Sequence, residues 1–492
     1  MHALVEVHPG SYHDSVTLMA VGGELARRDG VDAALMAMAT QLNLDLLAEL
    51  GFEAPAGAGP GDLVLAVRAA DAPTADATAA AAHALLAERA TAGSGSGDLL
   101  AAPAPPTVAA ATKRGRADVA LVSTPGEAAF TEAMDALRAG LHVVVFSDNV
   151  PIEQEQLLKR TAAERGLLVM GPDCGTVVLG GVGLGFANVV RPGPVSLVAA
   201  SGTGAQQVSC LLAHAGVGVN HVLGVGGRDL SDEIGAATTA QALRLLDDDP
   251  ATQLIGLVAK SASSAVLERI AEVTAELTTP VLHVAADRPG DDLTVGTDRL
   301  IEHLGTAVPR PASWPGGAGT PEPGALRGLF SGGTLCREAL TIAEPEIGTL
   351  STNLHDPGLD LTTPGHLLVD LGADEMTRGR PHPMIDQLLR LRRIEADAAD
   401  PATSVLLLDV VLGHGAHPDP AAELAPTIGE ARRAALADGR ELGVVVSVIG
   451  TPDDPQGLSR QAEALASVGA DVFSSNAEAA RHAVTLALGA HR

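Results

Sequence analysis

The chain has 492 residues, of which 46% are hydrophobic and 2% aromatic, and its formal net charge is −28. A chain of this length is too long to fold around a single hydrophobic core, so we expect several domains. The negative charge argues against nucleic acid and anionic membranes as partners. The longest apolar runs are strand-sized, no signal peptide is visible, and three cysteines cannot form a disulfide framework, so we expect a cytoplasmic protein.

The first 90 residues alternate strand and helix patterns. We expect strands at 3–9, 31–39 and 62–69, and helices at 13–28, 43–51 and 73–90. Six elements in this length predict a small α+β domain of the ferredoxin-like type, although a fourth strand is not evident. Asp14, after Tyr12 and His13, is expected to cap the first helix. This domain is expected to dock subunits rather than perform chemistry.

Two stretches rich in Gly, Ser, Pro and Ala, 90–107 and 309–324, predict linkers. Between them, continuous apolar runs alternate with helix-length segments, which indicates parallel sheets covered on both faces. The turns that follow such strands are where α/β proteins bind ligands. The expected strands are 118–124, 142–147, 167–171, 195–200, 221–226, 253–259 and 280–286.

An internal repeat relates the middle of the chain to its end. Residues 197–212 resemble 329–340, and residues 221–264 resemble 366–415, so we expect two homologous open-sheet domains. In this alignment Lys260 matches Val411, and "GHG" at 413–415 is expected to follow an equivalent strand and open a helix. Helix N-termini attract anions, so two related domains packed face to face would direct theirs toward one shared cleft.

The repeated segments resemble the α subunit of succinyl-CoA synthetases, the matching half of ATP-citrate lyase, and the C-terminal flavodoxin-like domain of the synthetase β subunit. Together with "SYHDSVTLM" (11–19), "GRPHPMID" (379–386) and "GHGAHPDPA" (413–421), the arrangement is similar to the FdrA family. No segment resembles an ATP-grasp domain. The segments that carry the α-subunit resemblance are "GPDCGTVVLGGVGLGFA" (171–187), 193–227 and "LDDDPATQLIGLVAK" (246–260), and 326–492 resembles the β-subunit domain.

This resemblance implies an α/β fold. It places a truncated CoA-binding-type Rossmann domain and two succinyl-CoA-synthetase-like flavodoxin-like domains after the small α+β domain. The implied bounds are 1–90 for the α+β domain, 108–190 for the Rossmann domain, and 191–308 and 325–492 for the flavodoxin-like domains.

Three departures from the synthetase pattern bear on function. The family's phosphohistidine loop is missing from 286–305, where His303 is the nearest histidine and is expected on the surface. Lys260 stands where the family has the glutamate that orients that histidine, and a lysine would neutralise a bound anion. The glycine-rich CoA phosphate loop is missing, because "GSGSG" (93–97) lies in a linker and not between a strand and a helix.

Three functional alternatives remain, of which the resemblance implies the first two. The first is a carbamoyl-transfer subunit acting on oxamate or carbamoyl phosphate in ureide or purine catabolism. The second is an acyl-CoA synthetase, a CoA ligase that works with a separate ATP-grasp chain. The third is a non-catalytic scaffold. In each case we expect a homo-oligomer within a hetero-complex of catabolic subunits. No cofactor is certain, and CoA stays a candidate despite its missing loop.

Two glycine-rich turns are predicted to bind phosphate or a carboxylate through backbone N–H groups. Simple helix capping is the structural alternative. The predicted donors are Ser201, Gly202, Thr203 and Gly204 in the first domain and Ser331, Gly332, Gly333 and Thr334 in the second.

The family's active-site loop and substrate turn have counterparts here. Asp173, Cys174 and Gly175, with Asn188, are predicted to line the site. A nucleophilic Cys174 would need a lowered pKa, for which the sequence has no signal. Gly227 and Arg228 lie in a turn that resembles the family's "GGD" turn near the substrate. Arg228 is predicted to clamp a carboxylate bidentately, with a surface arginine as the alternative.

Histidines near the end supply the catalytic candidates. His417 is predicted as an anion donor or general acid, and it would polarise a carbamoyl carbonyl together with Lys260. Arg380 and His382 are predicted to contact substrate, with a solvated loop as the alternative. Gly413, His414, Gly415 and Ala416 are predicted to line the anion site. Metal binding by His414 and His417 is not expected, because glycine-rich turns rarely align ligands on one helix face.

Overall fold

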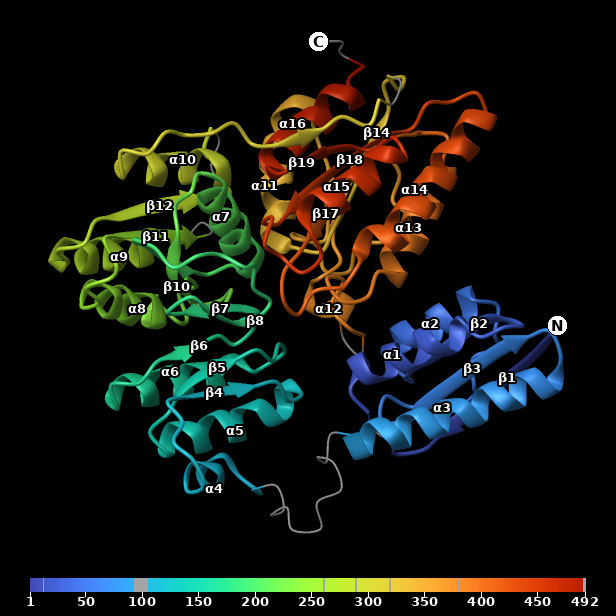
Figure 1. Cartoon of the computed structure of the whole chain (residues 1–492), viewed down its shortest axis with the longest axis horizontal. Helices are drawn as coiled ribbons and strands as arrows, with labels where there is room; N and C mark the ends of the chain where they lie inside the picture. The colour runs from blue at the N-terminus through green and yellow to red at the C-terminus, as the bar shows by residue number, and fades with distance from the viewer. Residues whose placement is uncertain are drawn as a thin grey trace. The chain divides into compact units, whose positions relative to one another are not determined.

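The computed structural model describes residues 1–11, 13–92, 105–259, 262–287, 290–317, 320–377 and 380–489. It divides into two compact units (Figure 1). The first comprises Met1–Ala104 with Ala373–Asp386, and the second comprises Pro105–Gly372 with Gln387–Arg492. Across the described ranges, no helix combines the length and hydropathy needed to cross a membrane.

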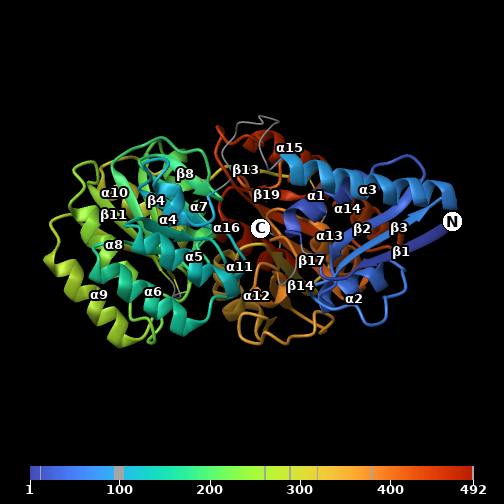
Figure 2. The same ribbon diagram turned by 90° about the horizontal axis from the view of Figure 1, so that it is seen from below.

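The first unit is a three-stranded antiparallel sheet of order β1–β3–β2, which confirms the predicted small α+β domain. A fourth strand is absent from the part of this unit that the structure describes, so β1 lies at an edge. Helices α1 and α3 lie along one side of the sheet (Figure 2). The elements are β1 (His2–His8), α1 (Ser15–Ala26), β2 (Val31–Met38), α2 (Gln41–Glu49), β3 (Leu63–Ala69), α3 (Ala72–Ala92) and α12 (Asp374–Thr377).

The second unit begins with a small parallel sheet of order β4–β5–β6, as expected for a truncated Rossmann domain. Its alanine- and valine-rich helices and strands bury a core of small side chains. The elements are α4 (Val108–Thr112), β4 (Val119–Val122), α5 (Gly126–Arg138), β5 (His142–Val145), α6 (Ile152–Glu164) and β6 (Val169–Met170).

The next sheet has the order β12–β11–β9–β10–β7–β8, in which the first four strands are parallel. The hairpin β7–β8 joins its edge antiparallel to β10, so these residues belong to this sheet and not to the Rossmann domain that was expected to extend to 190. The elements are β7 (Thr176–Leu179), β8 (Val182–Gly185), β9 (Val195–Ala199), α7 (Gly202–His214), β10 (Val219–Gly224), α8 (Ala237–Asp247), β11 (Leu254–Ala259), α9 (Ser264–Glu276), β12 (Val281–Ala285) and α10 (Leu293–His303).

The last sheet has the order β13–β19–β18–β17–β14–β16–β15. Its four strands β18–β17–β14–β16 repeat the order β12–β11–β9–β10, which supports the predicted duplication. Strand β13 comes from the expected linker 309–324. The elements are β13 (Ser313–Trp314), β14 (Ala325–Phe330), α11 (Gly333–Ile347), β15 (Ser351–Thr352), β16 (Leu367–Asp370), α13 (Leu388–Ala399), β17 (Thr403–Val411), α14 (Pro420–Ala437), β18 (Gly443–Ile449), α15 (Leu458–Ser467), β19 (Asp471–Phe473) and α16 (Asn476–Ala487).

The two repeated domains exchange matching hydrogen bonds across their contact. Gln207 on α7 accepts a hydrogen bond at 3.0 Å from the backbone N–H of Asn476, at the start of α16. Glu338 on α11 accepts one at 2.7 Å from the N–H of Leu293, at the start of α10. Each domain therefore uses a side chain of its first helix to satisfy a helix N-terminus of the other.

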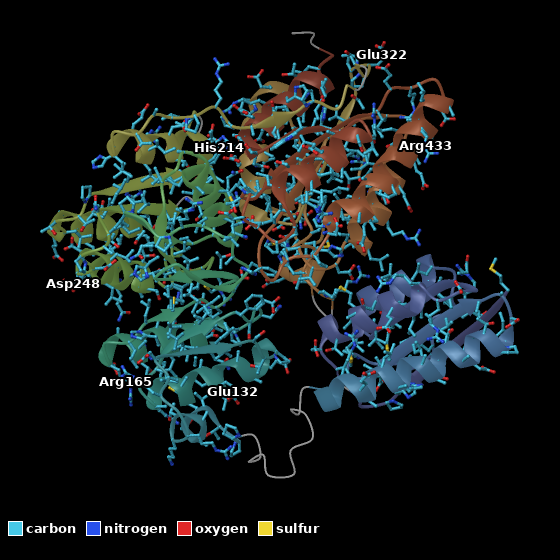
Figure 3. The ribbon with its side chains drawn as sticks, viewed as in Figure 1. Glu132, Arg165, His214, Asp248, Glu322 and Arg433 are labelled. Carbon is cyan, nitrogen blue, oxygen red and sulfur yellow. The ribbon has the colours of Figure 1, made fainter. Side chains whose placement is uncertain are left out.

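The central strands β9, β14, β17 and β18 are buried and mostly apolar, whereas most charged side chains lie on the helices and loops. Arg165, Asp248 and Arg433 are exposed examples at the surface of the second unit (Figure 3). This distribution keeps most of the net charge at the surface, with a few charged side chains buried in the interior.

Candidate functional site

Two turns stand at the same place in the two repeated domains. The first follows β9, where Ser201 caps α7 by accepting a hydrogen bond at 2.9 Å from the N–H of Gly204. The second follows β14, where Gly332 is the N-cap of α11. Both helices begin at the carboxyl ends of parallel strands, as the sequence predicts.

The two turns contact each other directly instead of facing an open cleft. The Ser201 hydroxyl donates a hydrogen bond at 2.6 Å to Oγ1 of Thr334. A Cβ atom added at Gly332 would lie only 2.5 Å from Oγ1 of Thr203, so this position needs a glycine for the close approach. The turns after β9 and β14 are therefore packed against each other.

The α11 turn is filled by a carboxylate of the protein itself. Asp409 accepts hydrogen bonds from the N–H of Ser331 at 2.8 Å, from its hydroxyl at 2.8 Å, and from the N–H of Gly332 at 3.0 Å. The guanidinium of Arg390 pairs with the same carboxylate at 2.9 Å, and both side chains are at most 1% exposed. A ligand would have to displace Asp409, so the structure favours a structural role for Ser331 and Gly332 over the predicted anion binding.

A second carboxylate stands beside this turn. A Cβ atom added at Gly333 would lie 2.5 Å from Oδ2 of Asp370. Asp370 and Asp409 together give the start of α11 two buried negative charges, which would repel a phosphate or carboxylate ligand.

The α7 turn is different because no carboxylate among the described residues occupies it. Within the described ranges, the N–H groups of Gly202 and Thr203 donate no hydrogen bond to the protein, as is normal for the first turn of a helix. Both residues are partly exposed, and Oγ1 of Thr176 lies close to Gly202. This helix N-terminus can hold one small anion.

The loop before β7 lies against the turn after β10. Gly226 has a φ of +87°, and a Cβ atom there would lie 2.5 Å from the carbonyl oxygen of Pro172. Cys174 is buried, and its thiol donates a hydrogen bond at 3.3 Å to the carbonyl of Gly224. Burial raises the pKa of Cys174 to about 12, so the thiol stays protonated and is unsuited to nucleophilic attack.

The remaining residues predicted to line this loop differ in exposure. Asp173 is exposed, and Gly175 packs against the ring of Phe186. Asn188 is buried, and its amide donates to the carboxylate of Asp454 at 2.8 Å. Asn188 therefore ties the segment after β8 to the last domain through Leu412 and Asp454.

Arg228 and its neighbours form an ion-pair network. Its guanidinium lies 2.9 Å from Glu155 and donates to the carbonyl of Val150 at 2.7 Å. Buried Lys159 pairs with Glu155 at 2.8 Å and with Asp229 at 2.7 Å. Gly227 precedes this network. Since Arg228 already has a carboxylate partner, the predicted clamp on a substrate carboxylate gains no support.

The glycine–histidine turn at 413–416 is a docking point for the segment after β8. His414 and Ala187 form an antiparallel bridge with hydrogen bonds of 2.8 and 3.2 Å. Gly413 has a φ of +109°, and a Cβ atom there would collide with Ala187. Gly415 has a φ of +80° and packs on Gly185. The turn does not open a helix, because α14 begins only at Pro420; this prediction is wrong.

The histidines of this turn have different surroundings. His414 is exposed, as is Gly415, and Ala416 is partly buried. His417 accepts a hydrogen bond at 3.1 Å from the N–H of Asp419, the N-cap of α14, and its Nε2 lies 3.4 Å from Glu423. These contacts orient His417 toward the helix start. In the described part of the chain, neither histidine belongs to a group of three metal-ligating side chains.

The remaining residues singled out in the sequence are Lys260, Arg380, His382 and His303. Lys260 falls outside the described residues, so its predicted role stays a prediction. Arg380 and His382 belong to the first compact unit, not the second. Arg380 donates to Oδ1 of Asn43 at 2.9 Å, and Nδ1 of His382 accepts from the N–H of Met384 at 3.2 Å. His303 ends α10 and is exposed, as expected.

Sequence reasoning missed Asp409, Arg390 and Thr176. Asp409 had a visible signal, because it is a lone carboxylate within the apolar run "SVLLLDVVLG". A charge buried in a strand needs a partner, and this requirement points to nearby N–H groups and an arginine. Thr176 had no distinguishing signal.

Comparisons with known proteins agree with this architecture. Residues 1–101 match a family described as AllF, heavy metal-associated domain, and residues 329–486 match the CoA-ligase family. YahF of Escherichia coli (strain K12) is 34% identical over 97% of this chain and 97% of its own length. Subunit alpha 2 of the ADP-forming succinate–CoA ligase from Archaeoglobus fulgidus is 28% identical over 47% of this chain and 77% of its own.

A solved structure of dinucleotide-forming acetyl-coenzyme A synthetase 1 from Ca. Korarchaeum cryptofilum is 17% identical. It covers 80% of this chain and 86% of its own, with a TM-score of 0.32, which is too low to compare sites. The nearly full-length similarity to YahF and the CoA-ligase match in the second unit show that the chain belongs to the FdrA family of succinyl-CoA-synthetase-like proteins.

Proposed function

We propose that this chain is a group-transfer subunit that binds one small anion, a phosphate compound or a carboxylate, at the N-terminus of α7. The observation that carries the proposal is that the two turns differ in whether a carboxylate of the protein occupies their N–H groups. Asp409 fills the α11 turn, whereas the N–H groups of Gly202 and Thr203 stay available at the α7 turn. With a single anion site, direct transfer of a group between two substrates bound together is favoured over a mechanism that passes phosphate from one helix N-terminus to another.

The transferred group that we propose is carbamoyl. The phosphate of carbamoyl phosphate would bind the α7 N-terminus, and the amide nitrogen of an acceptor such as oxamate would attack the carbonyl carbon. The new C–N bond forms as the C–O bond to phosphate breaks, the nitrogen loses a proton, and phosphate leaves from the same donors. The hydroxyl of Thr203 lies at this turn and would orient the phosphate.

The segment 286–305 supports a reaction without enzyme phosphorylation. Its histidine, His303, ends α10 at the exposed surface. The N-cap of α10 is Asp292, whose carboxylate accepts from the N–H of Val295 at 2.8 Å. A direct transfer needs no histidine that carries a covalent phosphate, which agrees with the surface position of His303 in this segment.

A second candidate is acid–thiol ligation, in which the chain forms a CoA thioester with a separate ATP-grasp chain. The CoA-ligase match over residues 329–486 and the similarity to a succinate–CoA ligase α subunit favour it. We expect this reaction to require a phosphorylated intermediate on a histidine or on the substrate.

The two candidates are separated by their products. We would incubate the full chain, alone and with the proteins that co-purify with it, with ¹³C-carbamoyl phosphate and oxamate, and follow the carbamoyl carbon by NMR. A parallel reaction would contain ATP, CoA and a carboxylate, with thioester as the readout. Carbamoyl product without thioester supports the first candidate. Thioester or acid-labile protein phosphate without carbamoyl product contradicts it.

The anion site has a matched pair of variants. Gly202 is the first residue of α7, where proline is tolerated because the helix does not use that N–H. Gly202→Pro removes one donor, whereas Gly202→Ala adds a side chain but keeps the donor. Losing a hydrogen bond to a charged ligand is worth about 1.5–3 kcal/mol, so calorimetry should show carbamoyl phosphate affinity falling roughly tenfold or more in the proline variant alone.

A further inference from the structure

Three metal-ligating side chains converge in the first compact unit. Glu6 and His8 lie two residues apart on β1, so their side chains leave the same face of the sheet. His83 reaches them from α3. Nε2 of His8 lies 3.2 Å, and Nε2 of His83 lies 3.0 Å, from the same oxygen of Glu6. The two imidazole rings are 4.9 Å apart and nearly perpendicular.

The fold fixes both sides of this cluster. On β1, Leu4 shares the face of Glu6 and His8 and packs against the core, while the antiparallel register pairs Glu6 with Leu65. On α3, Ala82 is buried beside His83. The cluster therefore lies at the border between β1 and α3, on well-formed elements, with side chains that are 33–44% exposed.

The spacing suits a metal ion. A tetrahedral ion with bonds of about 2.1 Å separates neighbouring ligand atoms by about 3.4 Å. The three ligand atoms here lie within 4.8 Å of one another, and two of the three separations are 3.0 and 3.2 Å. Small side-chain rotations would bring the third separation to the same value.

The donor set defines the class of ion. Two imidazole nitrogens and one carboxylate oxygen suit borderline divalent ions such as Zn²⁺, Co²⁺ and Ni²⁺. The first 101 residues contain no cysteine, so thiolates that favour soft ions are not available. Each imidazole can present its Nε2 lone pair while keeping its proton on Nδ1, and Glu6 supplies a negative charge.

We propose that Glu6, His8 and His83 bind a divalent transition-metal ion, with the remaining coordination positions open to water or to another ligand. The geometry of these three side chains carries this inference, independently of the proposed transfer reaction. A purely structural cluster would be two histidines hydrogen-bonded to one carboxylate, and it would show no preference for a metal ion.

The test uses the full chain after removal of metal with a chelator. Zn²⁺ would be titrated in competition with a chromophoric chelator, against the wild type and the variants His8→Ala, His83→Ala and Glu6→Gln. His2→Ala is a matched control, because His2 lies on β1 and on the same face but outside the cluster. His303→Ala controls for an exposed histidine of the second unit.

We expect one Zn²⁺ site whose affinity falls about tenfold or more in each ligand variant and is unchanged in both controls. Zn²⁺ should also raise the melting temperature of the wild type and not of Glu6→Gln, a near-isosteric change at a partly exposed side chain. Equal Zn²⁺ affinity in the wild type and the three variants, or no Zn²⁺ binding by the wild type, would overturn the proposal.

Discussion

The turns after β9 and β14 begin as copies of one another and have acquired different partners. At the α11 turn, Ser331 and Gly332 hold the carboxylate of Asp409, which Arg390 also pairs. At the α7 turn, Ser201 caps the helix and contacts Thr334, while the first N–H groups stay free of protein acceptors in the described structure. The two repeated helix starts thus differ: one holds a carboxylate of the chain itself, and the other holds none among the described residues.

This difference shows that the local sequence of a turn determines its backbone conformation, whereas neighbouring elements determine which group the turn binds. The motifs "SGTG" and "SGGT" both place backbone N–H groups at a helix start. Whether these groups face a ligand depends on the adjacent strand, which contributes Asp409 on β17 in the second domain. Four variants test this difference between the two domains, and they are ordered by the size of the change that we expect.

Asp409→Ala should have the largest effect, because it removes the carboxylate that pairs with the buried guanidinium of Arg390 and that accepts from the N–H groups of Ser331 and Gly332. Breaking a buried ion pair on one side destabilises a protein by about 3–5 kcal/mol. Urea denaturation would measure the loss, with exposed Asp453→Ala as the control. Added phosphate should partly restore the melting temperature of the variant. A variant as stable as the wild type would show that Asp409 does not hold the turn.

The matching side chains Glu338 and Gln207 differ in charge, and this predicts a pH dependence. Burial raises the pKa of Glu338 from 4.5 to about 7. A raised pKa means that the folded state keeps the proton, so stability is full below about pH 4.5 and falls as the pH rises through 7, by roughly 3 kcal/mol in all. Glu338→Gln copies the neutral counterpart and should flatten this fall in melting curves recorded between pH 5 and 8. An unchanged pH profile would contradict the assignment.

Gly413→Ala tests whether the glycine–histidine turn is a docking point. Its φ of +109° and its approach to Ala187 both disfavour a side chain. Strain and overpacking together should destabilise the protein by about 2–4 kcal/mol. Gly439 has a φ of +75° with open space around it, so Gly439→Ala measures the cost of backbone strain without any steric overlap. Equal losses of urea stability in the two variants would exclude the packing contribution.

Ser201→Ala should have the smallest effect on stability, because it removes one helix cap and one hydrogen bond to Thr334. Loss of a serine cap is worth about 1 kcal/mol. The N–H groups of Gly202 and Thr203 are retained, so calorimetric affinity for carbamoyl phosphate should change less than in Gly202→Pro. A larger loss of affinity in Ser201→Ala would mean that the hydroxyl, rather than the backbone, holds the anion.

Much of the fold could be predicted because its strands are continuous apolar runs. The seven strands expected between 118 and 286 all occur, as do the three strands and three helices expected in the first 90 residues. The hairpin β7–β8 was missed because the glycines at 180, 181, 183 and 185 obscure the strand pattern. The inclusion of Ala373–Asp386 in the first unit was also missed, because it depends on tertiary contacts.

The candidate site could be predicted only in part. The positions of Ser201 and Ser331 at helix starts follow from strand and turn patterns. The partner of each turn depends on register, since β14 pairs Leu329 with Leu408 and so brings Asp409 next to Ser331. A shift of one residue would direct that carboxylate to the other face of the sheet. Register between distant strands is not visible in the local sequence.

The reciprocal hydrogen bonds of Gln207 and Glu338 join two domains that resemble parts of different subunits in the synthetases. Here one chain contains both domains, so their association is intramolecular and is governed by an effective concentration that dilution cannot lower. Subunit exchange can regulate an enzyme built from two chains, but it cannot separate two domains of the same chain.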